Sequence, residues 1–248
     1  HHLKTNFVLD WGAKAKPEGK AILKAVRKEK RSYLLEHEAK ILLAIHGAPK
    51  QMDTLATSAE EAVEAFKGMH KPVAMKIVSP DILHKSDSGG VQLGMKTTKE
   101  VRGAYRQIIK SARKHNPDAD IRGVLVTPMA EKGLEVIIGT KTDDQFGPVI
   151  MYGLGGIMVE ILNDVAFRVL PITRNDARRM IAETKSGPIL EGIRGQAPLD
   201  HKGLRRLLMI CAEIAEAYPE IEEMDLNPVI VHAKGISLVD ARIILKEK

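Results

Sequence analysis

The sequence predicts an α+β fold, because apolar strand-like runs occur in pairs and helical patterns separate the pairs. Two capping boxes, Ser58 with Glu61 and Thr97 with Glu100, mark the starts of two helices. A strict alternation of strand and helix, which would predict a parallel sheet, does not occur along the chain. The 248 residues suffice for one large domain or for two lobes.

The first half of the chain predicts three helices and two strands after a basic segment that turns helical before residue 30. Apolar residues recur at helical spacing in "YLLEHEAKILLAIHGAP", and Gly47 and Pro49 end that helix. Asn116 and Pro117 end the third helix. The expected elements are helices over 32–47, 58–68 and 99–115, and strands over 72–78 and 90–96.

The second half predicts short strands rich in Val and Ile, a glycine-rich turn, two helices and a closing pair of apolar runs. The expected strands are 122–129, 134–141 and 148–153, followed by the turn 153–160 and the run 167–172. The two helices cover 175–185 and 203–218, and the closing runs cover 224–231 and 236–245. The four residues "HAKG" join the closing runs and predict a hairpin loop.

Composition argues against a nucleic-acid-binding surface. Residues 14–31 hold eight Lys or Arg and two Glu, which accounts for the whole net charge of +6, so the remaining chain is neutral. Aromatic residues make up only 4%, too few for base-stacking platforms. Cys211 lies among apolar residues at helical spacing and predicts a buried, inert thiol. The sequence shows no apolar run long enough for a membrane span and no signal peptide, so a cytoplasmic location is expected.

The stretch "PDILHKSDSGGV" places a histidine and a lysine before two glycines, between two expected strands. Gly89 and Gly94 have the separation of a phosphate-binding P-loop, but Met95 follows where lysine should stand. Two interpretations stay open: a loop whose backbone N–H groups cover phosphates, and an ordinary glycine turn. His84 is either solvated or a carrier of a phosphoryl group, because neutral imidazole is nucleophilic near pH 7.

Two charged residues lie inside expected strands. Lys76 shares a strand face with Ala74 and Val78, so it either extends its ammonium group to water or neutralises an anion. Glu135 lies in the strand "GLEVIIG" and could pair with Lys76 or accept hydrogen bonds from a ribose.

The closing hairpin predicts a metal site. Asp225 and Asn227 share one strand face, and a four-residue loop places Asn227 opposite Asp240 and Asp225 opposite Arg242. Oxygen ligands on adjacent strands suit Mg²⁺, which binds one or two protein oxygens together with phosphates. The alternative is an ion pair of Asp225 with Arg242 and a purely structural Asn227.

Five motifs in this order resemble the ATP-grasp subunit, the β chain, of ADP-forming acetyl-CoA or acyl-CoA synthetases. They are "LEHEAKILLAIHGAP", "PVAMKIVSPDILHKSDSGGV", "MAEKGLEVIIG", "DDQFGPVIMYGLGGIMVEILNDVAFRVLPI" and "EMDLNPVIV…SLVDARI". The resemblance covers about residues 30–248 and implies an ATP-grasp fold, in which two α+β lobes enclose a nucleotide. The expected division is a first lobe over 30–127 and a second lobe over 128–248, preceded by a basic extension over 1–29 that begins with a tag remnant and that the resemblance does not explain. The basic extension is expected to pack on a partner or on the core.

The resemblance also implies roles for individual residues. His84 resembles the family's transient phosphoryl carrier, with Glu160 and Arg168 as residues that orient it or the moving phosphate. The implied nucleotide contacts come from Lys76, Lys85, Ser86, Gly89, Gly90, the hinge residues Pro128, Met129 and Ala130, and Glu135 at the ribose. The implied magnesium ligands are Asn227 and Asp240, with Asp225 nearby. Glu160 and Arg168 could equally be a helix-start carboxylate and a surface arginine.

The implied reaction converts acyl-CoA, ADP and phosphate into carboxylate, CoA and ATP, reversibly, with ATP or ADP and Mg²⁺ bound. A CoA-binding α subunit is the implied partner, in a heterotetramer. Thr127 in the hinge strand "VTPM" leaves the preference for adenine over guanine open. Two other functions stay open: another ATP-grasp ligase that joins a carboxylate to an amine, and a non-catalytic nucleotide-sensing module.

Overall fold

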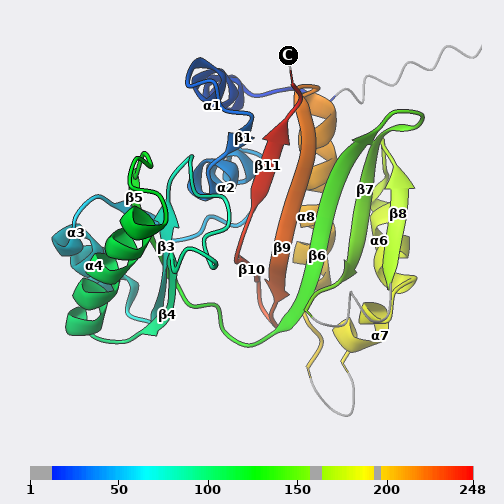
Figure 1. Ribbon diagram of the computed structural model, residues 1–248. Helices are drawn as coiled ribbons and strands as arrows, with labels where there is room; N and C mark the ends of the chain where they lie inside the picture. The colour runs from blue at the N-terminus through cyan, green and yellow to red at the C-terminus, as the bar shows by residue number, and fades with distance from the viewer. Residues whose placement is uncertain (1–12, 157–163, 193–196, 248) are drawn as a thin grey trace, which may run out of the picture.

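The computed structural model describes residues 13–156, 164–192 and 197–247, which form two antiparallel sheets with helices packed on them (Figure 1). The smaller sheet has the strand order β2-β5-β3-β4 and the larger sheet the order β1-β11-β9-β6-β7-β8, with β10 paired to β9. The α+β class expected from the sequence is confirmed.

The smaller sheet is covered by two helices that begin where the sequence predicts. Its elements are β2 (Thr54–Ala56), α3 (Ala59–Met69), β3 (Val73–Val78), β4 (Val91–Met95), α4 (Thr98–His115) and β5 (Gly123–Pro128). Ser58 accepts a hydrogen bond from the N–H of Glu61, and Thr97 with Glu100 forms the complete capping box. Met75, Ile77 and Ile108 lie in the core between this sheet and its helices.

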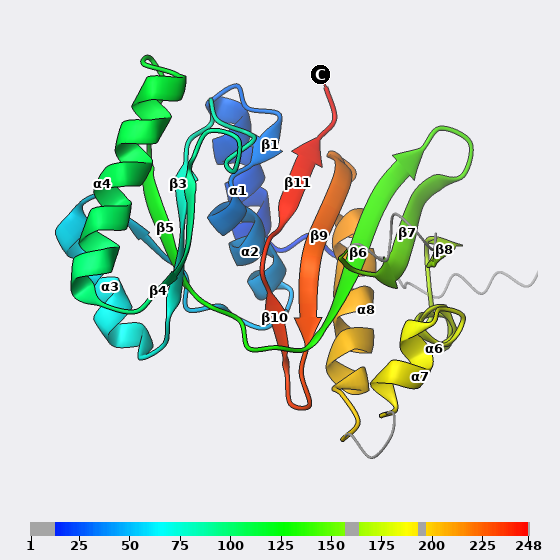
Figure 2. The same cartoon turned by 60° about the horizontal axis from the view of Figure 1, so that its bottom comes forward.

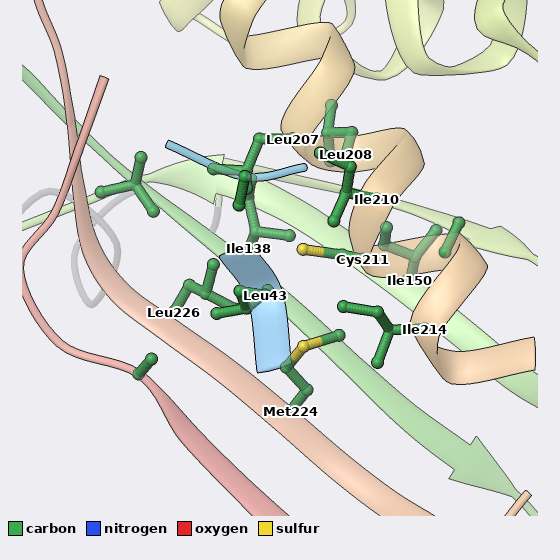
Figure 3. Close-up of a cluster of buried hydrophobic side chains, with 14 of the residues drawn as sticks. Leu43, Ile138, Ile150, Leu207, Leu208, Ile210, Cys211, Ile214, Met224 and Leu226 are labelled. Atoms are coloured by element: carbon green, nitrogen blue, oxygen red, sulfur yellow. The ribbon is translucent and has the colours of Figure 1, made fainter. Parts of the chain in front are cut away.

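The larger sheet carries the larger core. Its elements are β1 (Tyr33–Leu34), β6 (Leu134–Asp143), β7 (Gly147–Leu154), β8 (Val165–Val169), β9 (Ile221–Val231), β10 (Ile236–Leu238) and β11 (Arg242–Leu245), with helices α1 (Pro17–Lys28), α2 (Glu36–Ile45), α6 (Arg174–Ala182), α7 (Ser186–Leu190) and α8 (His201–Ala217). Figure 3 shows α8 side chains such as Leu208 and Cys211 packed against Ile138 and Leu226 of the sheet. The expected burial of Cys211 is confirmed, and burial raises the pKa of its thiol to about 12.

The first strand and the second helix of the chain belong with the larger sheet, before the chain forms the smaller sheet. β1 pairs with β11, so residues 33–34 join the sheet that the last residues of the chain complete. Leu42 and Leu43 of α2 are buried in the same core. The smaller sheet and its helices span residues 54–128 and form the smaller lobe, whereas β1 and α2, expected in a first lobe over 30–127, pack with the larger sheet.

The described part of the basic segment packs on the larger core, one of the two positions expected for it. Leu23 and Val26 of α1 are buried there, and the N–H of Lys16 donates to the Tyr218 hydroxyl at 3.0 Å. Figure 2 shows α1 and α2 side by side next to β1 and β11. The basic charges of α1 therefore lie on the outer face of a helix whose inner face is apolar.

The closing strands follow the expected register as far as Ile244, and the register shifts between Ile244 and Leu245. Ile236 pairs with Val231, which confirms the four-residue loop over 232–235, and Arg242 pairs with Asp225 as predicted. The expected single strand over 236–245 is divided into β10 and β11, because residues 239–241 leave the ladder. This unpaired stretch brings Asp240 to the space between the two lobes.

Candidate functional site

A cavity of about 460 Å³ lies between the two lobes and collects residues from both. The smaller lobe contributes Lys76 of β3 and the loop that follows it, including His84. The larger lobe contributes Glu36, Asn227 and Asp240. The lysine, the oxygen donors and the imidazole that the sequence singled out therefore line one cavity, together with Lys85 and Ser86.

Lys76 forms an ion pair with a residue that the sequence analysis did not identify. All six residues of β3 are buried, and the Lys76 ammonium lies 2.8 Å from Glu36 and 2.9 Å from the carbonyl oxygen of Val239. The expected alternative pair of Lys76 with Glu135 is wrong, because Glu135 is exposed at the start of β6 and does not line this cavity. The ribose contact expected of Glu135 stays a prediction.

Glu36 is the centre of a buried charge cluster. Its carboxylate lies 2.6 Å from Lys85, 2.8 Å from Lys76 and 3.0 Å from Lys40, and Lys40 also lies 2.9 Å from Asp53. We call these five residues the Glu36 cluster. The Glu36 side chain is only 1% exposed, and a buried carboxylate requires partners of this kind.

The lysines keep Glu36 ionised. Burial by itself raises the pKa of Glu36, but the charges of Lys85, Lys76 and Lys40 outweigh it and hold the pKa well below its usual range. In return, Glu36 and Asp53 raise the pKa of Lys40 against the effect of its own burial. Lys76 and Lys85 both line the cavity beside the single Glu36 carboxylate, so this part of the wall has one cation more than it has anions, which suits an anionic ligand such as a polyphosphate.

The pKa of Asp240 is shifted in the opposite direction to that of Glu36. Burial raises the pKa of Asp240, and the nearby Glu36 carboxylate raises it further. The Asp240 carboxylate accepts a hydrogen bond from the backbone N–H of Ala241 at 2.9 Å. A half-buried carboxylate in this position favours a bound cation, because a cation would offset the cost of ionising it.

The oxygen donors of the cavity fit a magnesium ion that is bound partly by protein oxygens and partly by phosphate oxygens. Asn227 and Asp240 both line the cavity, whereas Asp225 faces Arg242 across β9 and β11 and is not part of the lining. Among the described residues, no three His, Cys, Asp or Glu side chains come together as a metal cluster. Mg²⁺ held by Asn227 and Asp240 would therefore complete its coordination with phosphate oxygens and water.

The loop over 80–90, which we call the His84 loop, is closed by its own hydrogen bonds. The N–H of Gly90 donates to the carbonyl oxygen of Lys85 at 2.7 Å, and that of Gly89 to Ser86 at 3.1 Å. The expectation that these N–H groups are free for phosphate is therefore wrong for this conformation. Gly89 has a φ of +65°, and a Cβ on Gly90 would lie 2.4 Å from Ile77, so both glycines serve the turn.

The remaining sequence-predicted residues lie away from the cavity. Pro128, Met129 and Ala130 connect β5 to β6 and are half-buried, and the N–H of Met129 donates to Pro72 at 2.8 Å. Arg168 lies on β8 at the far edge of the larger sheet and pairs with Glu183. The expectation that Arg168 orients His84 is therefore wrong, and its surface alternative holds. Glu160 lies outside the described residues.

The model of the ATP-grasp domain matches residues 25–245 of this chain. The chain belongs to the ATP-grasp family. It is 47% identical, over 93% of its length and 99% of the relative's, to acetate–CoA ligase [ADP-forming] II subunit beta of Pyrococcus furiosus. It is also 44% identical to 4-hydroxybutyrate–CoA ligase [ADP-forming] of Nitrosopumilus maritimus, over 92% of this chain but 33% of that longer protein.

Solved ATP-grasp structures resemble the whole described core. Acetyl-coenzyme A synthetase 1 of Ca. Korarchaeum cryptofilum, in complex with coenzyme A and Ca-AMPCP, superimposes with a TM-score of 0.87 at 46% identity, over 92% of this chain and all of that one. Another structure of that enzyme contains a phosphorylated phosphohistidine segment in the site I orientation. A third contains Mg-AMPPCP, with the segment pointing towards the nucleotide-binding site. In the described part of this ATP-grasp chain, no helix is long and apolar enough to cross a membrane.

Proposed function

We propose that this chain is the nucleotide-binding β subunit of an NDP-forming acyl-CoA synthetase, which converts acyl-CoA, ADP and phosphate reversibly into carboxylate, CoA and ATP. The observation that carries the proposal is the convergence of Lys76, His84 and the oxygen donors Asn227 and Asp240 on one cavity between the lobes. The identity to β subunits of ADP-forming acetate–CoA ligases over nearly their whole length supports the same reaction class.

His84 carries the phosphoryl group between two sites in this proposal. The imidazole receives the group from an acyl phosphate at the partner's site, where a first phosphohistidine relays it. At the cavity, the P–N bond of phospho-His84 breaks as a P–O bond forms to the terminal oxygen of ADP, which yields ATP and neutral imidazole. The two segment orientations in the Korarchaeum enzyme support a His84 loop that changes orientation between these sites.

The other cavity residues position and neutralise the phosphates. Lys76, held in a buried strand, supplies fixed positive charge beside the transferred group. Lys85 and Ser86 extend the same wall from the His84 loop. Mg²⁺, held by Asn227 and Asp240, would neutralise phosphate oxygens when bound. The hinge residues Pro128, Met129 and Ala130, as base contacts, and Glu135, as the ribose contact, are supported by the family resemblance alone, because they lie outside the cavity lining.

The partner is a CoA-binding α subunit, with which the chain forms a heterotetramer. The Pyrococcus relatives are β subunits, which implies a second subunit. In the Nitrosopumilus relative the matching region is about a third of one longer chain, so the remainder of such a chain can supply the CoA-binding part. Mass measurement of the co-expressed subunits tests the stoichiometry.

Labelling of His84 tests the function. The chain is incubated with its α subunit, acyl-CoA and ³²P-phosphate, and we expect acid-labile, base-stable label on His84. His84→Ala should abolish labelling and ATP formation while MgADP still binds. Transfer that survives His84→Ala would favour another ATP-grasp ligase. Nucleotide binding without any label on the protein would favour a sensing module.

A further inference from the structure

We propose that Glu36 is a positioning residue that holds the His84 loop at the nucleotide cavity through its ion pair with Lys85, and that this pair breaks each time the loop leaves the cavity. The inference rests on the proposed function, in which the loop changes orientation. It assigns the holding contact to two side chains of this chain.

Lys85 is the polar tie between the middle of the loop and the rest of the protein. Among the described residues, the hydrogen bonds of residues 83–87 stay within the loop, except that Lys85 donates to Glu36 at 2.6 Å. The ends of the loop are tied separately: the N–H of Ile77 donates to Gly90 at 2.7 Å, and that of Asp120 to Asp81 at 2.6 Å. The ends can therefore stay in place while the middle moves.

The Glu36 cluster can lose Lys85 without leaving a buried charge unpaired. A buried carboxylate that loses every partner strongly destabilises a protein, because its charge is left without compensation. Here Glu36 keeps Lys76 at 2.8 Å and Lys40 at 3.0 Å after Lys85 departs. One lysine is enough to compensate the charge of Glu36, and Glu36 has three. The contact with Lys85 can therefore break and form again without exposing Glu36 to the cost of an unpaired buried charge.

The three lysines of the Glu36 cluster differ in side-chain exposure and in the element that carries them, and Lys85 is the one suited to a reversible contact. Lys40 on α2 and Lys76 on β3 have side chains only 7% and 9% exposed, so they are permanent partners in regular structure. The Lys85 side chain is 23% exposed and lies on a loop. Water can therefore solvate the Lys85 ammonium as soon as it leaves Glu36, and Lys85 is the partner that is released at the lowest cost.

Amide hydrogen exchange of the full chain tests this assignment independently of catalysis. In Lys85→Met we expect exchange in residues 83–90 to accelerate about tenfold, the factor for one charge-assisted hydrogen bond, with α2 and β3 unchanged. Lys85→Arg, which preserves the charge, should restore protection. Lys67→Met serves as the matched control, because Lys67 also pairs with a glutamate but on the exposed face of α3.

A second variant shows whether the protection runs through Glu36. Glu36→Gln should accelerate exchange in the same residues, and the double variant should add nothing to Lys85→Met. Exchange in 83–90 that stays at the wild-type rate in Lys85→Met overturns the inference, and so does acceleration that the Lys85→Arg variant shares. If Glu36→Gln does not fold, the comparison of exchange rates in Lys85→Met and Lys85→Arg by itself tests whether the charge of Lys85 holds the loop.

His84 labelling by Mg-[γ-³²P]ATP separates the two proposals. An unlabelled wild-type chain contradicts the proposed function, whatever the exchange rates. A labelled wild type with unchanged exchange in Lys85→Met contradicts only the role of Glu36. We expect Lys85→Met to lower the single-turnover labelling rate, because His84 spends less time at the cavity.

Discussion

Glu36 of α2 and Lys76 of β3, which lie 40 residues apart in the chain, form a buried ion pair at 2.8 Å across the two lobes. Glu36 begins a helix that packs with the larger sheet, whereas Lys76 belongs to the smaller sheet. The pair therefore fixes the position of the cavity lysine relative to the oxygen donors of the closing hairpin. Its removal should affect both stability and phosphate binding.

Glu36→Gln should lower the free energy of unfolding by about 3–5 kcal/mol, the cost of leaving buried charges without their counter-ion. Urea unfolding at neutral pH measures the change. Glu64→Gln is the matched control, since Glu64 pairs with Lys67 on an exposed face and should cost less than about 0.5 kcal/mol. Equal effects of the two substitutions would contradict a structural role for the Glu36 cluster.

Stability should fall in acid through Glu36. The lysines hold the folded-state pKa of Glu36 below its usual value of 4.5, so its stabilising contribution is complete above that pH and is lost as pH falls through the folded pKa. Urea unfolding from about pH 7 to about pH 3 should show the stability difference between wild type and Glu36→Gln constant above about pH 4.5 and narrowing below it, with part of the difference still present at the acid end because the folded pKa lies well below its usual range. A constant difference between them across this range would show that ionised Glu36 is not the source.

The sequence predicted the local features of this fold better than its long-range contacts. The capping residues Ser58 and Thr97 and the loop over 232–235 depend on neighbouring residues, so local patterns sufficed. The pairing of β1 with β11 joins the two ends of the chain, and no local pattern signals it.

The candidate site shows the same limit. Lys76, Asn227 and Asp240 stood out because a charged residue in an apolar strand and an oxygen pair in a hairpin are locally unusual. Glu36 did not stand out, since Glu36 and Lys40 have the spacing of an ordinary surface pair on a helix. The burial of Glu36 by β3 and the His84 loop is visible only in the folded structure, because these segments are distant in the sequence.

Removal of residues 1–28 should destabilise the protein, because α1 buries Leu23 and Val26 against the larger core. The loss of two such side chains corresponds to about 3–5 kcal/mol. Thermal and urea unfolding measure it, with a chain that begins at residue 13 as the reference. Unchanged stability of the shorter chain would contradict the packing of α1 on the core and would favour a role in binding the partner.

Arg168→Met should leave His84 labelling within about twofold of wild type, because Arg168 pairs with Glu183 at the far edge of the larger sheet and does not line the cavity. Its exposed ion pair should contribute less than about 1 kcal/mol to stability. Single-turnover labelling with Mg-[γ-³²P]ATP measures the effect, and Lys76→Met provides the comparison that should lose most activity. A comparable loss in Arg168→Met would require Arg168 to reach the cavity in another conformation.

Asp240→Asn should make the ligand-free protein more stable and the nucleotide-bound protein less so. Burial and the nearby Glu36 carboxylate raise the pKa of Asp240, so ionising it at neutral pH costs free energy that the amide avoids. With Mg²⁺ and ADP present, the wild type should gain about 2.7 kcal/mol at a ligand concentration of about 100 Kd, whereas the variant should gain little at that same concentration.

Thermal unfolding with and without MgADP measures both effects of Asp240→Asn in one experiment. Asp225→Asn is the matched control, because burial also raises the pKa of Asp225 but its side chain does not line the cavity. It should share the gain in stability and keep the response to MgADP. If both variants lost that response, the metal would lie between the two carboxylates. If neither lost it, Asp240 would have no part in binding the ion.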